Sequence, residues 1–325
     1  MPTDTMPAPP VDGSAPLVPL MRRLLYVAAA LVFLAGVPLF VFPARTDRYF
    51  AWTIDSRMTA VFLGAAYWSA IGLEVGAARA TSWARARIAV PAVFVFTSLT
   101  LIVSLVHLHK LHVHDEMAAS DMSASEMSAS ARGVAWAWLA IYAIVPVVMV
   151  VGWIGQHRRS TSVPPPGGLP AAMRVALLGL AVLLLGTGAG LLASPAWADH
   201  AWPWTLTPIT RGAVGAWLIG LGVAAGHAWL IDDRPSVRPL GLTGVTFGLL
   251  QAVALARYGH ELDWTSLSTA VYVAVLVALT IVSGWALLPS RPRRTEQRTV
   301  VAPIRPEGVD TRLSQPPMSR TGSSA

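Results

Sequence analysis

The chain has 325 residues, of which 54% are hydrophobic and only 13% are charged. A soluble domain carries about 25% charged residues, so the composition excludes an ordinary soluble protein and indicates one built for lipid. The formal net charge is +7, but the basic residues cluster on alternate loops, which indicates membrane topology and not a nucleic-acid partner. The absence of Cys from the sequence excludes disulfides, iron–sulfur clusters and thiolate metal sites.

Eight apolar segments, each close to the roughly 20 residues that cross a bilayer, lie between two polar tails. We place them at 22–43, 57–78, 88–108, 133–155, 172–194, 211–231, 239–258 and 266–289. The first is longer than the roughly 7–15-residue core of a secretory signal, so we interpret it as a retained helix. Residues 1–20 and 291–325 are rich in Pro and Ser, and we expect both tails to be disordered. The sequence therefore predicts an all-α integral membrane protein with eight transmembrane helices.

The distribution of Lys and Arg predicts the orientation of the chain. Most of them fall in the two tails and in the loops after the second, fourth and sixth segments. The other loops hold fewer basic residues and more acidic than basic ones. The positive-inside rule then places both termini in the cytoplasm of a multi-pass protein, which we expect in a bacterial plasma membrane.

The second half of the sequence repeats residues of the first half at matching places. The matched residues, first copy and then second, are Pro43 and Pro195, Asp47 and Asp199, Trp52 and Trp204, Thr59 and Thr210, Gly64 and Gly215, Phe96 and Phe247, His109 and His260, and Tyr142 and Tyr272. This pattern predicts two four-helix repeats, residues 21–156 and 172–290, joined by a cytoplasmic linker at 157–171. An even number of helices in each repeat makes the two copies parallel. The first repeat also carries an inserted external loop, about 112–132, that has no counterpart in the second.

Three segments carry a resemblance to a known group of proteins. They are residues 51–55, 138–146 and 204–217, the last beginning Trp-Thr-Leu-Thr-Pro. The chain resembles a family of uncharacterised bacterial polytopic membrane proteins over most of residues 22–290. The resemblance implies a polytopic fold with a duplicated four-helix unit, and it implies no reaction.

The repeated loops supply the first candidate site, a ligand-binding face on the external side. Its residues are Asp47, Trp52, His109, Asp199, Trp204 and His260. Stacking on Trp and pairing with Asp or His would suit a small ligand, and two His residues could hold one metal or haem between the halves. Structural alternatives remain open: the Trp residues could form an interfacial aromatic belt, the Asp residues could cap short turns, and each His could bond a neighbouring loop.

The densest group of possible metal ligands lies at the end of the third segment and in the inserted loop. It consists of His107, His109, His112, His114, Asp115 and Glu116. Imidazole and carboxylate ligands suit Zn²⁺ or Cu²⁺, and the Met residues that follow at regular spacing suit Cu(I). The low complexity of this stretch favours a solvated loop instead, so we expect no cofactor and keep Zn or Cu as the alternative.

Three polar residues lie inside the apolar segments: Glu74, His227 and Gln251. Ionisable groups are costly in lipid and point to function or to pairing. Glu74 and His227 lie near the predicted cytoplasmic boundary, so a packing role or contact with water at the surface is the alternative.

No catalytic signature stands out, whether a Ser/His/Asp set, a phosphate-binding Gly loop or a His-Glu-x-x-His sequence. We therefore expect a membrane protein that binds or transports a small molecule at the external interface between the halves. A scaffold or accessory subunit without a ligand of its own is the alternative, and a metal- or haem-dependent membrane enzyme is a further one. Membrane lipids are expected partners, and the oligomeric state is left open.

Overall fold

The computed structural model describes residues 15–113, 129–158 and 168–288. The regular secondary structure of this part of the chain is helical, apart from one isolated β-bridge between Pro16 and Ser82. The eight long helices are α1 (Pro19–Val41), α3 (Arg57–Ala78), α5 (Ala89–Val106), α6 (Ala129–His157), α7 (Ala171–Ala193), α9 (Pro208–Ile231), α10 (Arg234–Tyr258) and α11 (Leu267–Leu287). All eight are long and apolar enough to cross a membrane, which confirms the predicted all-α membrane fold.

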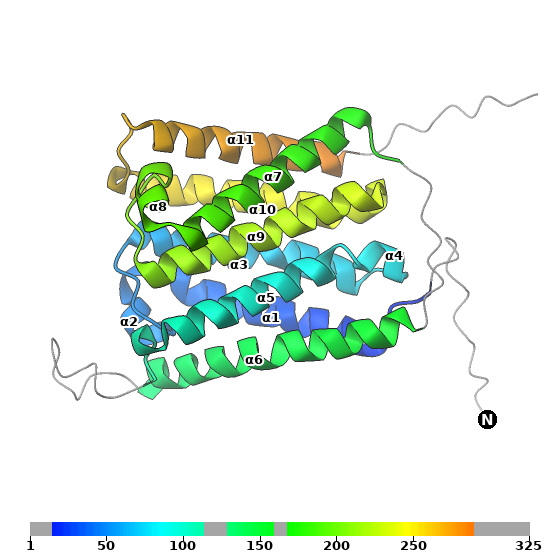
Figure 1. The fold of residues 1–325 in the computed structure, drawn as a ribbon, viewed down its shortest axis with the longest axis horizontal. Coiled ribbons are helices and arrows are strands. Elements are labelled where there is room, and N and C mark those ends of the chain that lie inside the picture. The colour runs from blue at the N-terminus through cyan, green and yellow to red at the C-terminus, as the bar shows by residue number, and fades with distance from the viewer. Residues whose placement is uncertain (1–14, 114–128, 159–167, 289–325) are drawn as a thin grey trace, which may run out of the picture. The chain divides into compact units, whose positions relative to one another are not determined.

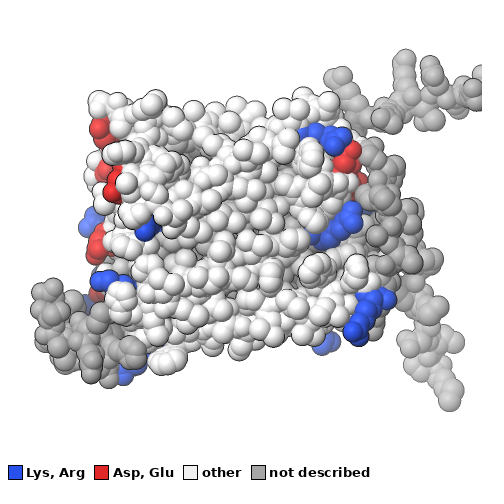
Figure 2. Space-filling view, viewed as in Figure 1, with Lys and Arg blue, Asp and Glu red and all other residues white. Residues whose placement is uncertain are grey.

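Charged residues gather at the two ends of this helical bundle. Figure 2 shows a broad uncharged band between them, as expected of a surface in contact with lipid. One end carries the short helices α2 (Thr46–Tyr49) and α8 (Pro195–Ala201), and the opposite end carries α4 (Trp83–Ala86) (Figure 1). We call these the α2/α8 end and the α4 end; the sequence predicts that the first is external.

The helices pack in an interleaved order. The closest pairings are α1 with α3 and α7 with α9, and these are joined by α3 with α10 and by α5 with α9. Thus α3 packs against α10 of the second half of the chain far more than against α5 of its own half. Four helices, α3, α5, α9 and α10, form the centre, whereas α6 and α11 lie at opposite edges of the bundle (Figure 1).

Helix α3 and helix α9 are the most buried spans, with 67% of the residues in each inside the protein. Both begin at a hydroxyl cap on the α2/α8 end: Ser56 Oγ accepts from the amide of Thr59, and Thr207 Oγ1 accepts from the amide of Thr210. The caps fix where each central helix starts, and therefore at what depth its polar residues lie.

Close backbone approach holds α3 against α1 and α9 against α7. A Cβ added to Gly64 of α3 would lie 2.7 Å from the backbone nitrogen of Phe40 on α1. A Cβ on Gly215 of α9 would lie 2.9 Å from the carbonyl oxygen of Gly188 on α7. Small residues at such crossings allow tight packing in lipid, where no hydrophobic force drives helices together.

Candidate functional site

The charged residues of the predicted external face lie on the surface of the α2/α8 end. Asp199, His109 and His260 are exposed, and Asp47 is partly exposed with an oxygen 3.8 Å from Nε of Arg48. None of these four residues lines either of the two cavities described below. Among the described residues, neither cavity therefore brings them together.

The two repeated Trp residues are buried in the core. The exposed fraction is 2% for Trp52 and 8% for Trp204, so neither belongs to an aromatic belt at the lipid surface. Trp204 Nε1 donates to Thr59 Oγ1 at 2.8 Å, which joins the loop after α8 to the first turn of α3. Trp52 Nε1 is also buried, but it has no partner in the part of the chain that the structure describes.

The His-rich stretch is spread out rather than gathered. The ring nitrogen Nδ1 of His107 is 3.0 Å from the carbonyl oxygen of Val103, one turn back on α5. Among the described residues no three His, Asp or Glu side chains form a group that could hold a metal ion. His114, Asp115 and Glu116 of the predicted set lie outside the described residues.

His112 is instead a connector between two loops. Its Nδ1 lies 3.1 Å from the carbonyl oxygen of Phe50, and its Nε2 lies 3.1 Å from Thr53 Oγ1. Burial lowers the pKa of His112 below its ordinary value, while the Phe50 carbonyl and the nearby Asp47 oppose that shift. The side chain thus ties the segment after α5 to the loop that carries Trp52.

Gln251 and His227, two of the three predicted intramembrane polar residues, differ in their surroundings. Gln251 is fully buried and satisfied: it donates to the carbonyl of Phe62 at 3.3 Å and accepts from the Tyr272 hydroxyl at 3.0 Å. His227 is half-buried near the α4 end of α9. Gln251 is therefore accounted for by helix packing.

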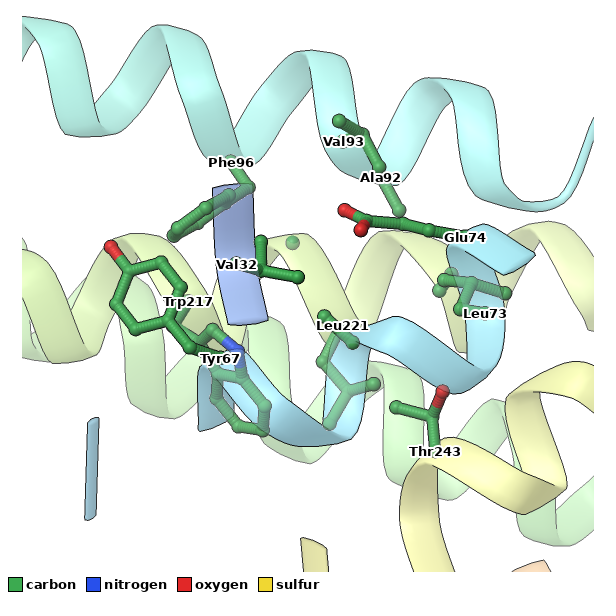
Figure 3. Close-up of a pocket in the computed structure, with 13 residues that line it drawn as sticks. Val32, Tyr67, Leu73, Glu74, Ala92, Val93, Phe96, Trp217, Leu221 and Thr243 are labelled. Carbon is green, nitrogen blue, oxygen red and sulfur yellow. The ribbon is translucent and has the colours of Figure 1, made fainter. Parts of the chain in front are cut away.

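Glu74, the third predicted intramembrane polar residue, differs from Gln251 because helix packing supplies it with no partner among the described residues. Its exposed fraction is 3%, and Oε2 has no hydrogen bond to any described residue. The carboxyl group points into a cavity of about 50 Å³ where α1, α3, α5, α9 and α10 meet (Figure 3). The wall is otherwise mostly apolar, with Val32, Leu73, Val93, Phe96 and Leu221 among its side chains.

Two further polar side chains line the same cavity. Thr243 of α10 is 2% exposed, and its Oγ1 likewise has no hydrogen-bond partner among the described residues. Tyr67 lies two turns from Glu74 on α3, and its hydroxyl is 2.8 Å from the hydroxyl of Tyr142 on α6. Trp138, whose ring packs against that of Tyr142 on α6, donates from Nε1 to Ser104 Oγ at 3.0 Å. Ser104 lies close to the α2/α8 end of α5.

The cavity has the size and chemistry of a small polar site in an apolar core. A buried polar pocket needs about 10–15 Å³ for each water, so this space holds a few waters at most. An unpaired carboxylate inside protein or lipid is costly, and the group must take up a proton or a cationic partner to remain there. The carboxyl group of Glu74 can therefore hold a proton or a small cation.

Sequence reasoning identified Glu74 from one signal, a charged residue within an apolar run. It missed Thr243 and Tyr67, because Thr and Tyr are common in membrane spans and nothing in their spacing sets them apart, and it noted Tyr142 only as the match of Tyr272 in the repeat. Only the crossing of α3 with α10 and the approach of α6 bring these residues near Glu74.

No protein-family model matches the chain, and the comparisons with curated proteins and with solved structures found no match either. The resemblance to a bacterial membrane-protein family stays a prediction. Its membrane character rests on the eight apolar helices.

Proposed function

We propose that the protein binds and transports a small molecule through the membrane interior, and that Glu74 carries the proton that accompanies it. The observation that carries this proposal is the unpartnered, buried Glu74 carboxyl group in a cavity between the central helices. Such a group costs stability without a partner, so its presence is best explained by a role in binding. Thr243 and Tyr67 supply the other hydrogen-bonding groups of the site.

The interleaved packing supports a transport role for this position. The cavity is lined by α3 and α5 from the first predicted repeat and by α9 and α10 from the second, so it lies where the two repeats meet. The cavity extends from Glu74, near the α4 end of α3, to Tyr67 at the middle of that helix. A site between repeats inside the membrane suits alternating access, in which one set of helices moves against the other. The proposal moves the binding site from the external face to this cavity.

The external loops serve a structural role in this proposal. Trp204 joins its loop to α3 through Thr59, and His112 joins the loop of Trp52 to the end of α5. These bonds also support the alternative of a scaffold subunit, in which the loops hold the helices together and no ligand binds. The buried carboxyl favours transport over that alternative, because a scaffold has no need of it.

Proton flux into liposomes that contain the purified protein tests the proposal. The vesicles hold a pH-sensitive dye, and a potassium gradient with valinomycin drives protons inward. We expect the wild type to acidify the vesicles faster than empty liposomes do. Glu74→Gln should reduce the rate to that of empty liposomes, and Glu74→Asp, which keeps a carboxyl group, should retain part of it.

Circular dichroism and size-exclusion profiles of each variant serve as the control for folding. A folded Glu74→Gln protein that transports protons as fast as the wild type would rule out the role of Glu74. Wild-type flux equal to that of empty liposomes would rule out proton movement through Glu74 in the absence of the small molecule.

A further inference from the structure

A second and larger cavity lies in the α2/α8-end half of the bundle, away from Glu74. Its volume is about 280 Å³, and its walls come from α3, α7, α8, α9, α10 and α11. Six aromatic residues contribute to it: Phe62, Trp197, Trp202, Trp217, Phe247 and Tyr272. Among the residues that the structure describes, no Lys, Arg, Asp or Glu lines this cavity, so its chemistry suits an uncharged molecule.

The cavity reaches the lipid-facing surface. Leu183 on α7 and Val271 on α11 both line it, and they are 40% and 49% exposed. Trp197 on α8, also 39% exposed, lies at the same cavity. A molecule dissolved in the membrane can therefore enter from the side without crossing a charged surface.

The first half of the chain shows what fills the matching space there. Trp138 on α6 packs its indole against Phe50, Trp52 and Tyr142, with ring centroids 4.5–5.2 Å apart. Tyr142 corresponds to Tyr272 in the sequence repeat, and Trp138 lies one turn before Tyr142. The residue one turn before Tyr272 is Ser268, which has no ring to place between the helices.

The counterparts of Phe50 and Tyr142 border the open cavity, whereas Trp204, the counterpart of Trp52, does not line it. Phe50 precedes Trp52 by the same spacing as Trp202 precedes Trp204, so Phe50 and Trp202 correspond in the repeat. Phe96 corresponds to Phe247. Trp202, Phe247 and Tyr272 all line the 280 Å³ space. In the second half Trp202 and Trp204 pack directly against Tyr272, with ring centroids 6.1 and 5.4 Å away, and no residue corresponds to the indole of Trp138.

One hydroxyl group in this cavity is free to bind a ligand. Thr187 of α7 lines the space, and its hydroxyl forms no hydrogen bond within the described residues. A helical Thr commonly bonds a carbonyl of the preceding turn, so a hydroxyl without that bond is available as a donor. The wall thus offers flat aromatic surfaces and a hydrogen-bond donor to a ligand acceptor.

We propose that this cavity binds a neutral, flat, two-ring molecule that carries a hydrogen-bond acceptor, such as a quinone, taken up from the membrane. The aromatic lining gives the shape, since the flat faces of Trp, Phe and Tyr rings stack on a flat ligand. The volume agrees, because an apolar cavity of about 150 Å³ already binds benzene. The proposal does not depend on Glu74, whose cavity shares only Trp217 with this one.

The test uses 1,4-naphthoquinone as the probe and the full chain in lipid nanodiscs. Quinones quench indole fluorescence, and three Trp residues line the cavity, so we expect saturable quenching by the wild type. Ser268→Trp should fill the space as Trp138 does in the first half, and it should weaken binding at least about tenfold. Val277→Trp adds the same ring on the lipid-facing side of α11, where Val277 is 51% exposed, and should bind as the wild type does.

A second variant keeps the test decisive if Ser268→Trp does not fold. Thr187→Val should weaken naphthoquinone binding by about three- to tenfold, as expected for the loss of one neutral hydrogen bond. It should leave unchanged the affinity of naphthalene, which lacks an acceptor, as obtained from competition with the quinone.

Three outcomes would overturn the proposal. The first is quenching that rises linearly with quinone and does not saturate, since this is partition into the bilayer only. The second is saturable binding that a folded Ser268→Trp protein and Thr187→Val both leave unchanged. The third is quinone quenching that a saturated fatty acid abolishes at a lower concentration than the quinone needs to bind, which would assign the cavity to lipid tails.

Discussion

Trp204 and Trp52 occupy matching places in the sequence, yet only Trp204 has a hydrogen bond, to Thr59 on α3. We predict that Trp204→Phe lowers the free energy of unfolding by about 0.5–1.5 kcal/mol beyond the effect of ring size, the usual net value of one hydrogen bond. The measurement is detergent or thermal unfolding of Trp204→Phe, Thr59→Val and the double variant.

Trp52→Phe is the matched control, because it removes an indole N–H that already lacks a partner among the described residues. It should lower the free energy of unfolding by less than Trp204→Phe does. A double-mutant cycle with no coupling between Trp204 and Thr59 would show that the bond adds nothing to stability.

His112 makes the stability of the α2/α8 end depend on pH. Burial lowers its folded pKa, so the unfolded chain binds the proton more readily. Its contribution is then fully present above the ordinary His pKa of about 6.5 and is lost as the pH falls from there towards the folded value. We predict that the free energy of unfolding falls between pH 7.5 and pH 5.5 in both proteins. The fall should be larger for the wild type than for His112→Gln.

Unfolding curves of both proteins at the two pH values measure this difference. His112→Gln keeps a polar side chain near Thr53 but cannot titrate. Equal pH dependence in the two proteins would mean that other groups cause the effect.

At the scale of helices, close packing through Gly limits what α3 accepts. A methyl group at Gly64 would meet the backbone nitrogen of Phe40 at 2.7 Å, and backbone cannot move aside as a flexible side chain can. We predict that Gly64→Ala destabilises the protein by about 1–3 kcal/mol, the usual cost of overpacking. Thermal unfolding in detergent measures it.

Gly186 on α7 gives the matched control, since a Cβ there would have no neighbour within 4 Å. Gly186→Ala should be neutral or slightly stabilising, because Ala is a better helix former. If both variants lose the same stability, the close approach of α1 and α3 is not the cause.

The long helices could be predicted from the sequence because length and hydrophobicity alone decide a membrane span. Helix α3 begins and ends where the apolar run 57–78 does. The short helices α2, α4 and α8 were not predicted, since four to seven polar and aromatic residues leave no periodic signal. Nor could the sequence show the packing of α3 against α10.

The candidate site, like the fold, could be predicted from the sequence only in part. A carboxyl group in an apolar run marks Glu74 without a structure. The repeated motif drew attention to Asp47 and Asp199, but repetition also arises where a loop must hold two helices together. Burial decides between these causes, and it depends on tertiary contacts that no local pattern encodes.

For the molecule as a whole, the predicted topology places the α2/α8 end outside and the α4 end inside. The chain has no Cys, so single substitutions give unambiguous labelling sites. We predict that an impermeant maleimide applied to intact cells labels Ala196→Cys on α8 and leaves Thr81→Cys, near α4, unlabelled until the cells are opened. Both positions are exposed.

The reverse labelling pattern would mean that the protein has the opposite orientation in the membrane. It would leave the fold intact and exchange the two sides of the proposed transport route.

The central claim is that Glu74 sits in the membrane interior as a carboxyl group that binds a proton. Dicyclohexylcarbodiimide reacts with protonated carboxyl groups in apolar surroundings, and mass spectrometry of the purified protein locates the adduct. We predict one dominant adduct on Glu74 in the wild type, its absence in Glu74→Gln, and a parallel loss of proton flux on modification. Equal modification of the wild type and of a folded Glu74→Gln protein, or no adduct on Glu74, would contradict the account.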